Sequence, residues 1–396
     1  MRIAVLFARF GPYHVARLRA LAHRHEVVGV ELSGENLNYA WAPIEVDGLQ
    51  HRQLFDGNHR AVRRSRLRSA LAALLDRVAP DVVAVPGWWD PGALLAIQWA
   101  RKHDVPAILM SDSARRDHPR TRWKEHLKSR VVRLCQAGLV AGRRHEAYLT
   151  DLGMPSERIY RGYDVVDNMH FAEGADRARD RADKLRSDLN VPESYFLTCC
   201  RFVEKKNLPF LLRAYAQYHA QSAAPRSLVL VGDGPKREAL EHQARDLGIA
   251  AHVQMPGFKQ YDELPSFYGL ADAFIQPSIR EQWGLVVNEA MAAGLPVLVS
   301  KACGCAPDLV AEGENGYTFD PTNAETLATL LGEMSGAACN QAAMGEESRR
   351  RIAEWTPAVF AEQMTAAARA AQSASPPSLR WSDSLLLRGL AWNAGE

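Results

Sequence analysis

The chain has 396 residues, of which 47% are hydrophobic and 24% are charged, and its formal net charge is only +2. This length suffices for two or three domains, and the composition is that of an ordinary globular protein. The sequence excludes a protein with a membrane-spanning helix, because no apolar run reaches the roughly 18 residues that such a helix needs.

The six cysteines indicate neither a zinc site nor a disulfide framework. Cys303 and Cys305 stand close together, but no second pair of Cys or His lies nearby to complete four zinc ligands. The apolar run at residues 1–8 is too short for a signal peptide and has no small-residue cleavage site. We therefore expect reduced thiols, no metal site and a cytoplasmic protein.

The first elements alternate between strand and helix patterns. Residues 3–7 and 27–30 are apolar runs typical of buried strands, and an amphipathic helix at 15–21 separates them. The loop after the first strand contains Gly11 and His14. Strand, glycine loop, helix and strand in this order predict a doubly wound α/β sheet. One glycine can serve the geometry of the turn alone or admit a ligand.

The same alternation continues along the chain. We expect helices at 60–79 and 91–103 and buried strands at 81–85 and 105–110. The following loop, 111–120, should open at the carboxyl end of its strand, where sheets of this kind bind ligands. The polar candidates for ligand contact in this loop are Asp112, Ser113, Arg116 and His118. A capped helix start is the alternative, since Ser and Asp make that equally well.

Residues 115–133 form a basic segment, with Arg or Lys at eight positions around Trp123. This density suits an anionic acceptor or an acidic bilayer surface. Nucleic acid would also suit the charge, but no nucleic-acid-binding motif accompanies it, so we expect none. The third interpretation is a solvated helix face.

The chain indicates two domains and a C-terminal extension. A strand and a helix within 136–153 complete the first domain, and the charged, alanine-rich stretch 172–190 is typical of a surface helix leading to the second. We expect the first domain at 1–172 and the second at 190–355. Residues 356–396 should form a crossover helix and a tail.

The second domain should begin with a strand at 195–199, and the loop after it contains Arg201 and Lys206. A guanidinium and an ammonium that converge on a diphosphate form charge-assisted hydrogen bonds worth roughly 1.5–3 kcal/mol each. A basic surface loop is the alternative. Later strands are expected at 227–231 and 253–257.

The most informative stretch follows an apolar strand at 273–277. A short loop follows this strand, and a helix is predicted after the loop. Gly284, Leu285 and Val286 form the start of this helix. The free N–H groups and the dipole of such a helix start suit a phosphate or a sugar oxygen. Glu281 before the helix and Glu289 inside it are acceptors suited to hydroxyl groups. A nucleotide-sugar has this composition, because its phosphates lie between two groups that carry hydroxyls, a hexose and a ribose.

Beyond this stretch the pattern predicts helices at 323–334 and 345–370. Trp355 and Phe360 are expected to pack back toward the first domain. The apolar tail segment 385–392 suits either an amphipathic surface anchor or simple packing, and the sequence does not choose between them.

The frame Glu281-x-Trp-Gly-Leu-x-x-x-Glu289-Ala-Met-Ala-x-Gly-x-Pro-Val closely resembles the donor-site motif of the retaining glycosyltransferases of family 4. This resemblance implies the α/β GT-B fold, in which two Rossmann-like doubly wound domains face a central cleft and a C-terminal helix crosses back. It implies transfer of a sugar from a nucleotide-diphosphate-sugar to a glycan or lipid-linked acceptor, with retention of anomeric configuration. The setting would be cell-surface polysaccharide or glycoconjugate biosynthesis, with peripheral contact at the inner face of an anionic membrane.

The resemblance also implies roles for single residues. Arg201 and Lys206 match the basic pair that stabilises the departing diphosphate, Glu281 would hold sugar hydroxyls, and Glu289 would hold the ribose. Phe258 and Lys259 stand where the family holds the nucleobase, and Gly11 matches one glycine of a loop near the donor phosphates. No Asp-x-Asp occurs in the chain, which agrees with a transferase that requires neither metal nor cofactor.

In the first domain the sequence departs from the family pattern. Asp112 stands where the family often places a His that reaches the donor sugar, so we expect Asp112 to take this catalytic role, with His118 as the second candidate. The residues expected on the acceptor side are His14, Ser113, Arg116 and His118.

Two alternatives to a transferase stay open. A nucleotide-sugar epimerase of the same fold would release an altered sugar without an acceptor. A non-catalytic carbohydrate-binding scaffold would keep the fold without turnover, although the complete set of basic and acidic site residues favours an enzyme.

Overall fold

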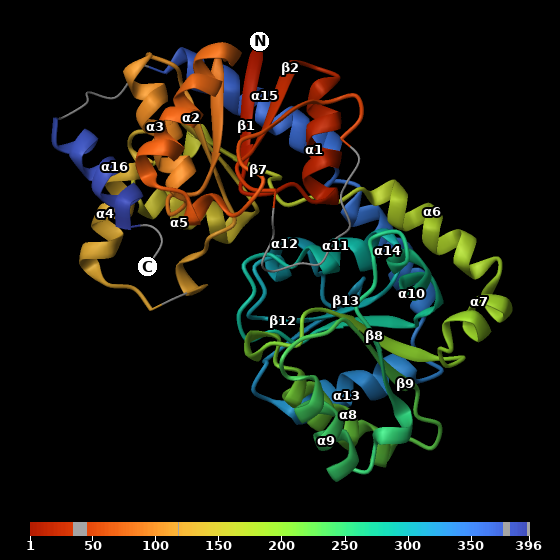
Figure 1. Ribbon diagram of the computed structural model, residues 1–396. Helices are drawn as coiled ribbons and strands as arrows, with labels where there is room; N and C mark the ends of the chain where they lie inside the picture. Colours follow the sequence, from red (N-terminus) through yellow and green to blue (C-terminus); the bar gives the residue numbers. More distant parts are fainter. Residues whose placement is uncertain (35–45, 118, 375–380, 394–396) are drawn as a thin grey trace. The chain divides into compact units, whose positions relative to one another are not determined.

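The computed structural model describes residues 1–34, 46–117, 119–374 and 381–393 (Figure 1). The chain divides into two compact units. Met1–Val165 and Pro357–Glu396 form the first unit, and Val166–Thr356 forms the second.

The first unit is built on a seven-stranded parallel sheet with the strand order β3-β2-β1-β4-β5-β6-β7. Its strands are β1 Arg2–Phe7, β2 Glu26–Glu31, β3 Gln50–Gln53, β4 Val82–Pro86, β5 Ala107–Ser111, β6 Ala137–Val140 and β7 Ile159–Arg161. Apart from Arg2 at the start of β1 and Ser111 at the end of β5, the central strands are apolar, and nearly all their residues are buried, which is what a parallel sheet covered by helices requires. Ile3 lies in register with Val27 on one side and Val82 on the other.

Helices cover both faces of this sheet (Figure 1). They are α1 Pro12–Ala22, α2 Arg64–Val78, α3 Pro91–Lys102, α4 Arg122–Val132, α5 Arg143–Asp151, α15 Pro357–Ser373 and α16 Trp381–Asn393, with short 3-10 turns at η1 His59–Ala61, η2 Arg115–Asp117 and η3 Ser156–Arg158. The helix expected at 60–79 begins later, at Arg64. The side chain of Asn58 accepts a hydrogen bond from Arg60 N and starts a separate turn, which ends in extended backbone at Val62.

The C-terminal part of the chain returns to the first unit. α15 packs against α1 and against strands β4 to β7, and its Phe360 and Met364 are fully buried. The single helix expected at 345–370 is wrong, because the structure has two helices, α14 Gln341–Ile352 and α15. Pro357 starts the second helix, since proline lacks an N–H and disfavours helical backbone in the residue before it.

The second unit holds a six-stranded parallel sheet with the order β10-β9-β8-β11-β12-β13. Its strands are β8 Tyr195–Cys199, β9 Ser227–Val231, β10 Val253–Gly257, β11 Ala273–Gln276, β12 Val297–Ser300 and β13 Gly316–Phe319. All the strands expected from the sequence in this region are confirmed. The order reverses between β8 and β11, which is the position where open α/β sheets bind ligands.

The helices of the second unit include two at its start that the sequence analysis set at the domain boundary, α6 Asn168–Arg179 and α7 Ala182–Leu189. The others are α8 Leu208–Gln221, α9 Arg237–Asp246, α10 Leu264–Leu270, α11 Leu285–Ala292, α12 Ala306–Leu309, α13 Ala324–Ser335 and α14, with 3-10 turns at η4 Glu204–Lys206 and η5 Ala250–His252. α6 packs against α10 and α11. Trp355 contacts Trp283 within this unit, with ring centroids 4.9 Å apart, so the expectation that Trp355 packs on the first domain is wrong.

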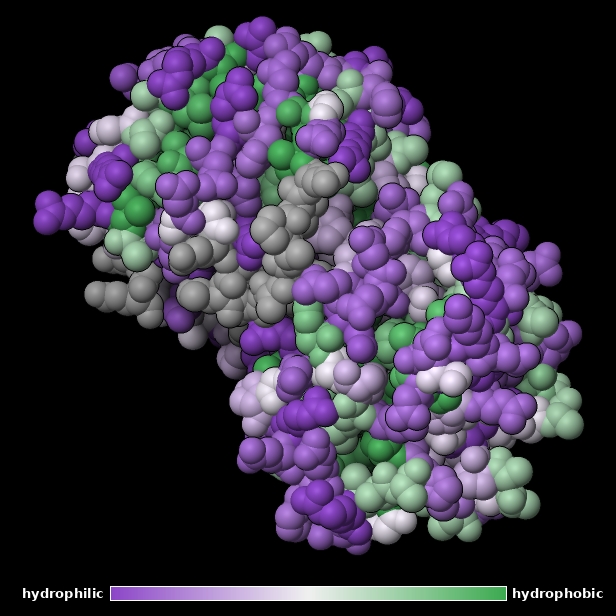
Figure 2. Space-filling view, turned by 45° about the vertical axis from the view of Figure 1, so that its right-hand side comes forward, coloured by the Kyte–Doolittle hydropathy of each residue, from purple (hydrophilic) through white to green (hydrophobic). Residues whose placement is uncertain are grey.

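Hydrophilic residues cover most of the face drawn in Figure 2, as the overall composition predicts. In the part of the chain that the structure describes, no helix is long and apolar enough to cross a membrane.

Candidate functional site

Two loops of the second unit approach each other closely at the carboxyl ends of β8 and β9. Phe202 N, in the loop after β8, donates a hydrogen bond of 2.9 Å to Asp233 O in the loop after β9. A Cβ atom on Gly232 would lie 1.9 Å from Cys200 O, and Gly232 has a φ of +133°. Only glycine therefore fits this position, and its presence lets the backbone of one loop rest on the other.

The loop after β8 is also tied to the strand end of β11. It closes with η4 and with Asn207, which adopts the left-handed conformation at a φ of +59°. Asn207 Nδ2 donates to Pro277 O at 3.2 Å and to Pro321 O at 2.9 Å. Ile279 N donates to Lys205 O at 3.0 Å. The backbone around Arg201 and Lys206 is thus fixed on both sides, and Arg201 is partly exposed at its start.

Lys206 and Glu281 contact each other at this edge. Lys206 Nζ donates to Glu281 Oε2, and the same oxygen accepts from Gln276 Nε2 at 3.0 Å and from Ser278 Oγ at 3.1 Å. The Lys206 and Glu281 side chains are only 12% and 11% exposed. Gly304 N donates to Glu281 O at 3.0 Å, which fixes the main chain as well. The carboxylate is therefore held in one orientation by a cation and two neutral donors.

The N-terminus of α11 lies directly beside this carboxylate. Gly284 has a φ of +109° and starts the helix, and a Cβ atom on it would lie 3.4 Å from Glu281 Cγ. Leu285 and Val286 follow in the first turn and are partly exposed. Backbone N–H groups of a first turn have no partner inside their helix, so this end can receive an anion. The structure thus brings Lys206, Glu281 and the start of α11 together.

The remaining residues expected to bind the donor differ in their surroundings. Glu289 is fully buried, and its Oε2 accepts a hydrogen bond of 2.6 Å from Tyr268 Oη. Phe258 lies directly after β10 and is 38% exposed. Lys259 Nζ lies 5.5 Å from the ring centroid of Phe267 and 3.9 Å from Glu263 Oε1. Sequence spacing could not show that Glu289 sits inside the unit.

The carboxyl edge of the first unit contains a neutral histidine at the start of α1. Gly11 N donates a hydrogen bond of 2.9 Å to His14 Nδ1, and the His14 ring packs 4.3 Å from the ring centroid of Phe7. Burial, and secondly the charge of Arg17, lower the pKa of His14 to about 3. His14 is therefore neutral at physiological pH, and because its Nδ1 accepts a hydrogen bond, its Nε2 carries the proton.

Asp112 follows β5 and lies among other carboxyl groups. Its pKa is raised to about 7, first by burial and then by the charges of Asp164 and Asp117, while Arg17 acts in the opposite direction. Burial also raises the pKa of Asp164, whose Oδ1 lies 3.3 Å from a terminal nitrogen of the buried Arg17. Arg17 also donates to Val165 O at 3.1 Å. Asp112 can therefore gain or lose a proton near neutral pH.

The other candidates of the 111–120 loop have separate positions. Ser113 N donates to Ser111 Oγ at 3.2 Å, and Ala114 N donates to Asp117 Oδ2 at 2.6 Å, so side chains of the loop shape it from within. Arg116 lies in η2 and is exposed. His118 lies outside the described residues.

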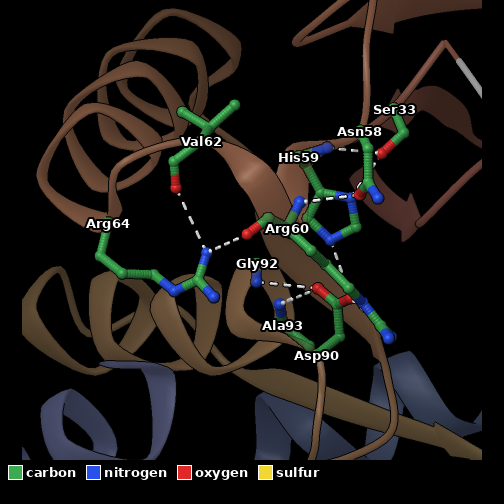
Figure 3. A network of polar contacts seen from close by, with 9 residues as sticks. All are labelled: Ser33, Asn58, His59, Arg60, Val62, Arg64, Asp90, Gly92 and Ala93. Carbon is green, nitrogen blue, oxygen red and sulfur yellow. Dashed lines mark hydrogen bonds and ion pairs between the residues drawn. The ribbon is translucent and has the colours of Figure 1, made fainter. Parts of the chain in front are cut away.

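Sequence reasoning missed a buried polar array at the same edge (Figure 3). Ser33 Oγ lies 2.5 Å from His59 Nδ1, and His59 Nε2 lies 2.8 Å from Asp90 Oδ2. Asp90 Oδ1 caps α3 by accepting from Gly92 N at 2.8 Å. Ser33, His59 and Asp90 are all buried. The array connects the end of β2, the turn η1 and the start of α3, so it holds these three segments together. Asp90 directly before Pro91 is a helix-start signal, but nothing in the sequence pairs Ser33 with His59.

Cys200 lies in the loop after β8, next to Arg201. Burial raises the pKa of the Cys200 thiol to about 12, so this sulfur stays protonated at neutral pH. Among the described residues, no group of three or more His, Cys, Asp or Glu side chains could hold a metal ion.

Residues 180–351 match the family described as Glycosyl transferases group 1. The chain is 30% identical over 193 residues to a GDP-mannose-dependent α-(1-6)-phosphatidylinositol monomannoside mannosyltransferase of Mycolicibacterium smegmatis, which covers 46% of this chain and 50% of that protein. It is 33% identical over 193 residues to a D-inositol 3-phosphate glycosyltransferase of Corynebacterium kroppenstedtii, covering 46% of this chain and 42% of that protein. The chain thus spans about half the length of these curated relatives.

Solved structures match over almost the whole chain. Anabaena HepE in complex with UDP superposes with a TM-score of 0.72 at 17% identity, covering 92% of this chain and 98% of that one. A trehalose-6-phosphate protein of Escherichia coli bound to UDP-2-fluoro glucose gives a TM-score of 0.72 at 12% identity, covering 95% and 100%. At this identity the likeness concerns the fold, and it confirms the GT-B fold expected from the sequence.

Proposed function

We propose that this chain transfers a sugar from a nucleotide-diphosphate-sugar to a glycan or lipid-linked acceptor, because residues 180–351 match the group 1 glycosyltransferases. The observation that carries the proposal is the junction of Lys206, Glu281 and the N-terminus of α11. A cation, a carboxylate and free backbone N–H groups at one point match the diphosphate and the sugar hydroxyls of such a donor.

Different residues of the second unit contact the diphosphate and the sugar of the donor. On donor binding, Lys206 turns from Glu281 to the diphosphate, and Arg201 and the start of α11 contact the same group. Glu281, still held by Gln276 and Ser278, accepts hydrogen bonds from sugar hydroxyls. These groups stabilise the charge that develops on the departing diphosphate, where losing one donor costs about 100–1,000-fold in rate. The reaction needs no metal, in keeping with the lack of an Asp-x-Asp motif.

The transfer proceeds with retention of anomeric configuration. The acceptor hydroxyl approaches the anomeric carbon from the face that the diphosphate leaves. The bond from that carbon to the phosphate oxygen breaks, the bond to the acceptor oxygen forms, and the acceptor proton passes to the leaving phosphate oxygen. No strong protein base is required for this step, and the protein contributes position and charge.

The remaining proposed contacts involve the nucleotide and the residues of the first unit. Phe258 and Lys259 contact the nucleobase, and Glu289 contacts the ribose after its bond to Tyr268 opens. Asp112 contacts substrate from the first unit. Gly11 lies near the donor phosphates. The acceptor-side residues are His14, Ser113 and Arg116, together with His118.

We propose an anionic acceptor in cell-surface polysaccharide or glycoconjugate biosynthesis. Two relatives carry a phosphorylated inositol in their names, phosphatidylinositol monomannoside in one and D-inositol 3-phosphate in the other. The loop at the carboxyl end of β5 presents the exposed Arg115 and Arg116, which suit a phosphate group.

Release of nucleotide diphosphate from a panel of UDP-, GDP- and ADP-sugars tests the proposal, with and without a membrane lipid extract. We expect release from one donor, stimulated by the extract, and a loss of at least about 100-fold in Glu281→Ala with an unchanged circular dichroism spectrum. The anomeric configuration of the product, measured by NMR, tests retention. Release of an altered sugar without acceptor would instead show an epimerase, and binding without turnover would show a scaffold.

A further inference from the structure

Three sulfur atoms lie close together in the second unit, at the loop that joins α13 to α14. Cys339 Sγ lies 3.9 Å from Met334 Sδ and 3.8 Å from Met344 Sδ. Met334 belongs to the last turn of α13, Met344 to the first turn of α14, and Cys339 to the loop 336–340 between the two helices. Both methionines are buried, whereas Cys339 is partly exposed, so the cluster has a path to solvent.

The main chain around these sulfurs is held by hydrogen bonds. Cys339 N donates to Gly336 O at 3.0 Å, and Gln341 Nε2 donates to Met334 O at 2.8 Å. The side chain of Asn340 caps the start of α14. The three sulfurs are therefore in place before any ligand binds, and a site that is organised in advance loses less conformational entropy on binding.

The Cys339 thiol cannot satisfy both neighbouring sulfurs by itself. An S–H group is a weak donor with a single proton, so it serves only one of two thioethers at a time. Methionine often fills irregular gaps in a core, and packing alone is the alternative explanation of the cluster. Packing, however, does not require that both methionine sulfurs, rather than their methyl groups, turn toward one thiol.

The distances between the sulfurs suit one metal ion bound by all three. A bond between a metal ion and a thiolate sulfur is about 2.3 Å long. Two sulfurs on one such ion lie about 3.8 Å apart at a tetrahedral angle and about 4.0 Å apart at a trigonal angle. The two measured separations, 3.8 and 3.9 Å, fall in this range.

We propose that Met334, Cys339 and Met344 bind Cu(I). Thiolate and thioether sulfurs are soft ligands that select this ion, whereas Mg²⁺ and Ca²⁺ take oxygen ligands. On binding, a copper–sulfur bond replaces the S–H bond of Cys339, and the proton passes to solvent. The charge of the thiolate then balances that of Cu(I), so the partly buried site stays neutral. Zn²⁺ with the same ligands would leave an uncompensated positive charge, which burial disfavours.

The ligand set explains why the sequence did not indicate this site. The expectation of no metal site rested on the spacing of Cys and His, and here methionine supplies two of the three sulfurs. Neighbouring ligands are five positions apart along residues 334–344. None of them belongs to the proposed donor or acceptor contacts, so this inference does not depend on the proposed sugar transfer.

Titration of the reduced full chain with Cu(I), without oxygen and with a chromophoric Cu(I) chelator as competitor, tests the proposal. We expect the parent chain to withdraw one Cu(I) from the chelator. Cys339→Ser should weaken this binding at least about 100-fold, because even an outer partner of a metal ligand contributes about 10–100-fold in affinity. Met334→Leu and Met344→Leu each remove one thioether and keep the packed volume, and each should weaken binding at least about tenfold.

Two variants elsewhere in the chain are the matched controls and should bind like the parent. Met169→Leu changes an exposed methionine of α6, and Cys135→Ala removes a buried thiol whose sulfur lies 4.0 Å from Val131 O. Circular dichroism shows whether each variant is folded. X-ray absorption at the copper edge should give three sulfur neighbours at about 2.3 Å in the parent, and two in Met334→Leu or Met344→Leu.

The proposal is wrong if the parent chain withdraws no Cu(I). Binding by Cys339→Ser that equals the parent's would place the metal at other thiols. Loss of binding in Cys339→Ser, with parent-like binding in both methionine variants, would show that the thiol alone takes the metal and that the methionines only pack. Displacement of Cu(I) by an equal amount of Zn²⁺ would contradict the assignment to a soft monovalent ion.

Discussion

At the scale of single residues, the contact between Lys206 and Glu281 gives the second unit a site that is organised before any ligand binds. The Glu281 carboxylate keeps two neutral donors, Gln276 and Ser278, when the lysine is removed or turned away. Lysine is a flexible point charge, so it can exchange a carboxylate for a diphosphate without moving the main chain. The two groups therefore hold each other in place between turnovers.

Lys206→Ala should reduce donor turnover by about 100–1,000-fold while leaving the free energy of unfolding nearly unchanged. The reason is that the ammonium acts on the developing charge of the diphosphate, and Glu281 retains its other partners. Lys205→Ala is the matched control, since Lys205 is exposed and its contact with Ile279 uses the backbone oxygen. Nucleotide diphosphate release and urea unfolding measure the two quantities. Equal losses of turnover in both variants would show that general positive charge, rather than Lys206, serves the site.

Asp112 gives a second prediction at this scale, which concerns stability against pH. Its pKa is about 7 in the folded chain, against an ordinary value of 3.8, because of burial and the neighbouring Asp164 and Asp117. A raised carboxyl pKa costs stability, and the cost grows as the pH rises from the unfolded value to the folded value. Asp112→Asn removes the charge, so it should stabilise the first unit more at pH 8 than at pH 5, by roughly 2 kcal/mol.

Urea unfolding of the parent chain and of Asp112→Asn at both pH values checks this prediction. Asp151→Asn is the control, because Asp151 is an exposed carboxylate of the same unit. A gain for Asp112→Asn that is the same at pH 5 and pH 8 would mean that Asp112 does not titrate between them.

At the scale of elements, the sequence predicted most strands and the helix α11. In an α/β chain, a short apolar run followed by glycine or a polar loop is nearly always a buried strand. The sequence placed Lys206 and Glu281 at strand ends, and a parallel sheet brings such ends to one edge. It could not predict that the Glu289 carboxylate accepts a hydrogen bond from Tyr268, because that contact depends on how α11 packs against α10. It also missed the array of Ser33, His59 and Asp90, whose members come from three separate elements.

The close approach of the loops after β8 and β9 leads to a prediction about Gly232. Gly232→Ala should destabilise the second unit by roughly 2–4 kcal/mol, because its Cβ would overlap Cys200 O and its φ is positive. It should also weaken nucleotide diphosphate binding, since the displaced loop carries Arg201. Gly248→Ala is the control: Gly248 also has a positive φ, of +70°, but a Cβ there would meet nothing within 4 Å.

Urea unfolding and calorimetric titration with the nucleotide diphosphate check this pair. Gly248→Ala should cost only about 1–2 kcal/mol, the strain of a left-handed residue, with unchanged affinity. An equal cost in both variants would show that the two loops do not constrain each other.

At the scale of the whole molecule, the chain builds one unit from both of its ends. α15 starts at Pro357, directly after the second unit, and buries Phe360 and Met364 in the first. The sequence pattern predicts a helix here, and the resemblance to family 4 implies that a C-terminal helix crosses back. The hydrophobic period cannot show which core the helix joins, because that choice depends on contacts with residues more than 300 positions away, such as those between α15 and α1. The wrong expectation for Trp355 has the same origin.

This division predicts that core mutations act on one unit at a time. Phe360→Ala should remove about 3–5 kcal/mol from the first unit, and Leu331→Ala, in the core of the second, about 2–5 kcal/mol from that one. Hydrogen exchange followed by mass spectrometry distinguishes them. Phe360→Ala should lower protection in β1 and β4 to β7 and leave β8 to β13 unchanged, and Leu331→Ala should do the reverse. A loss of protection spread over both sheets in either variant would show that the two units unfold as one cooperative structure.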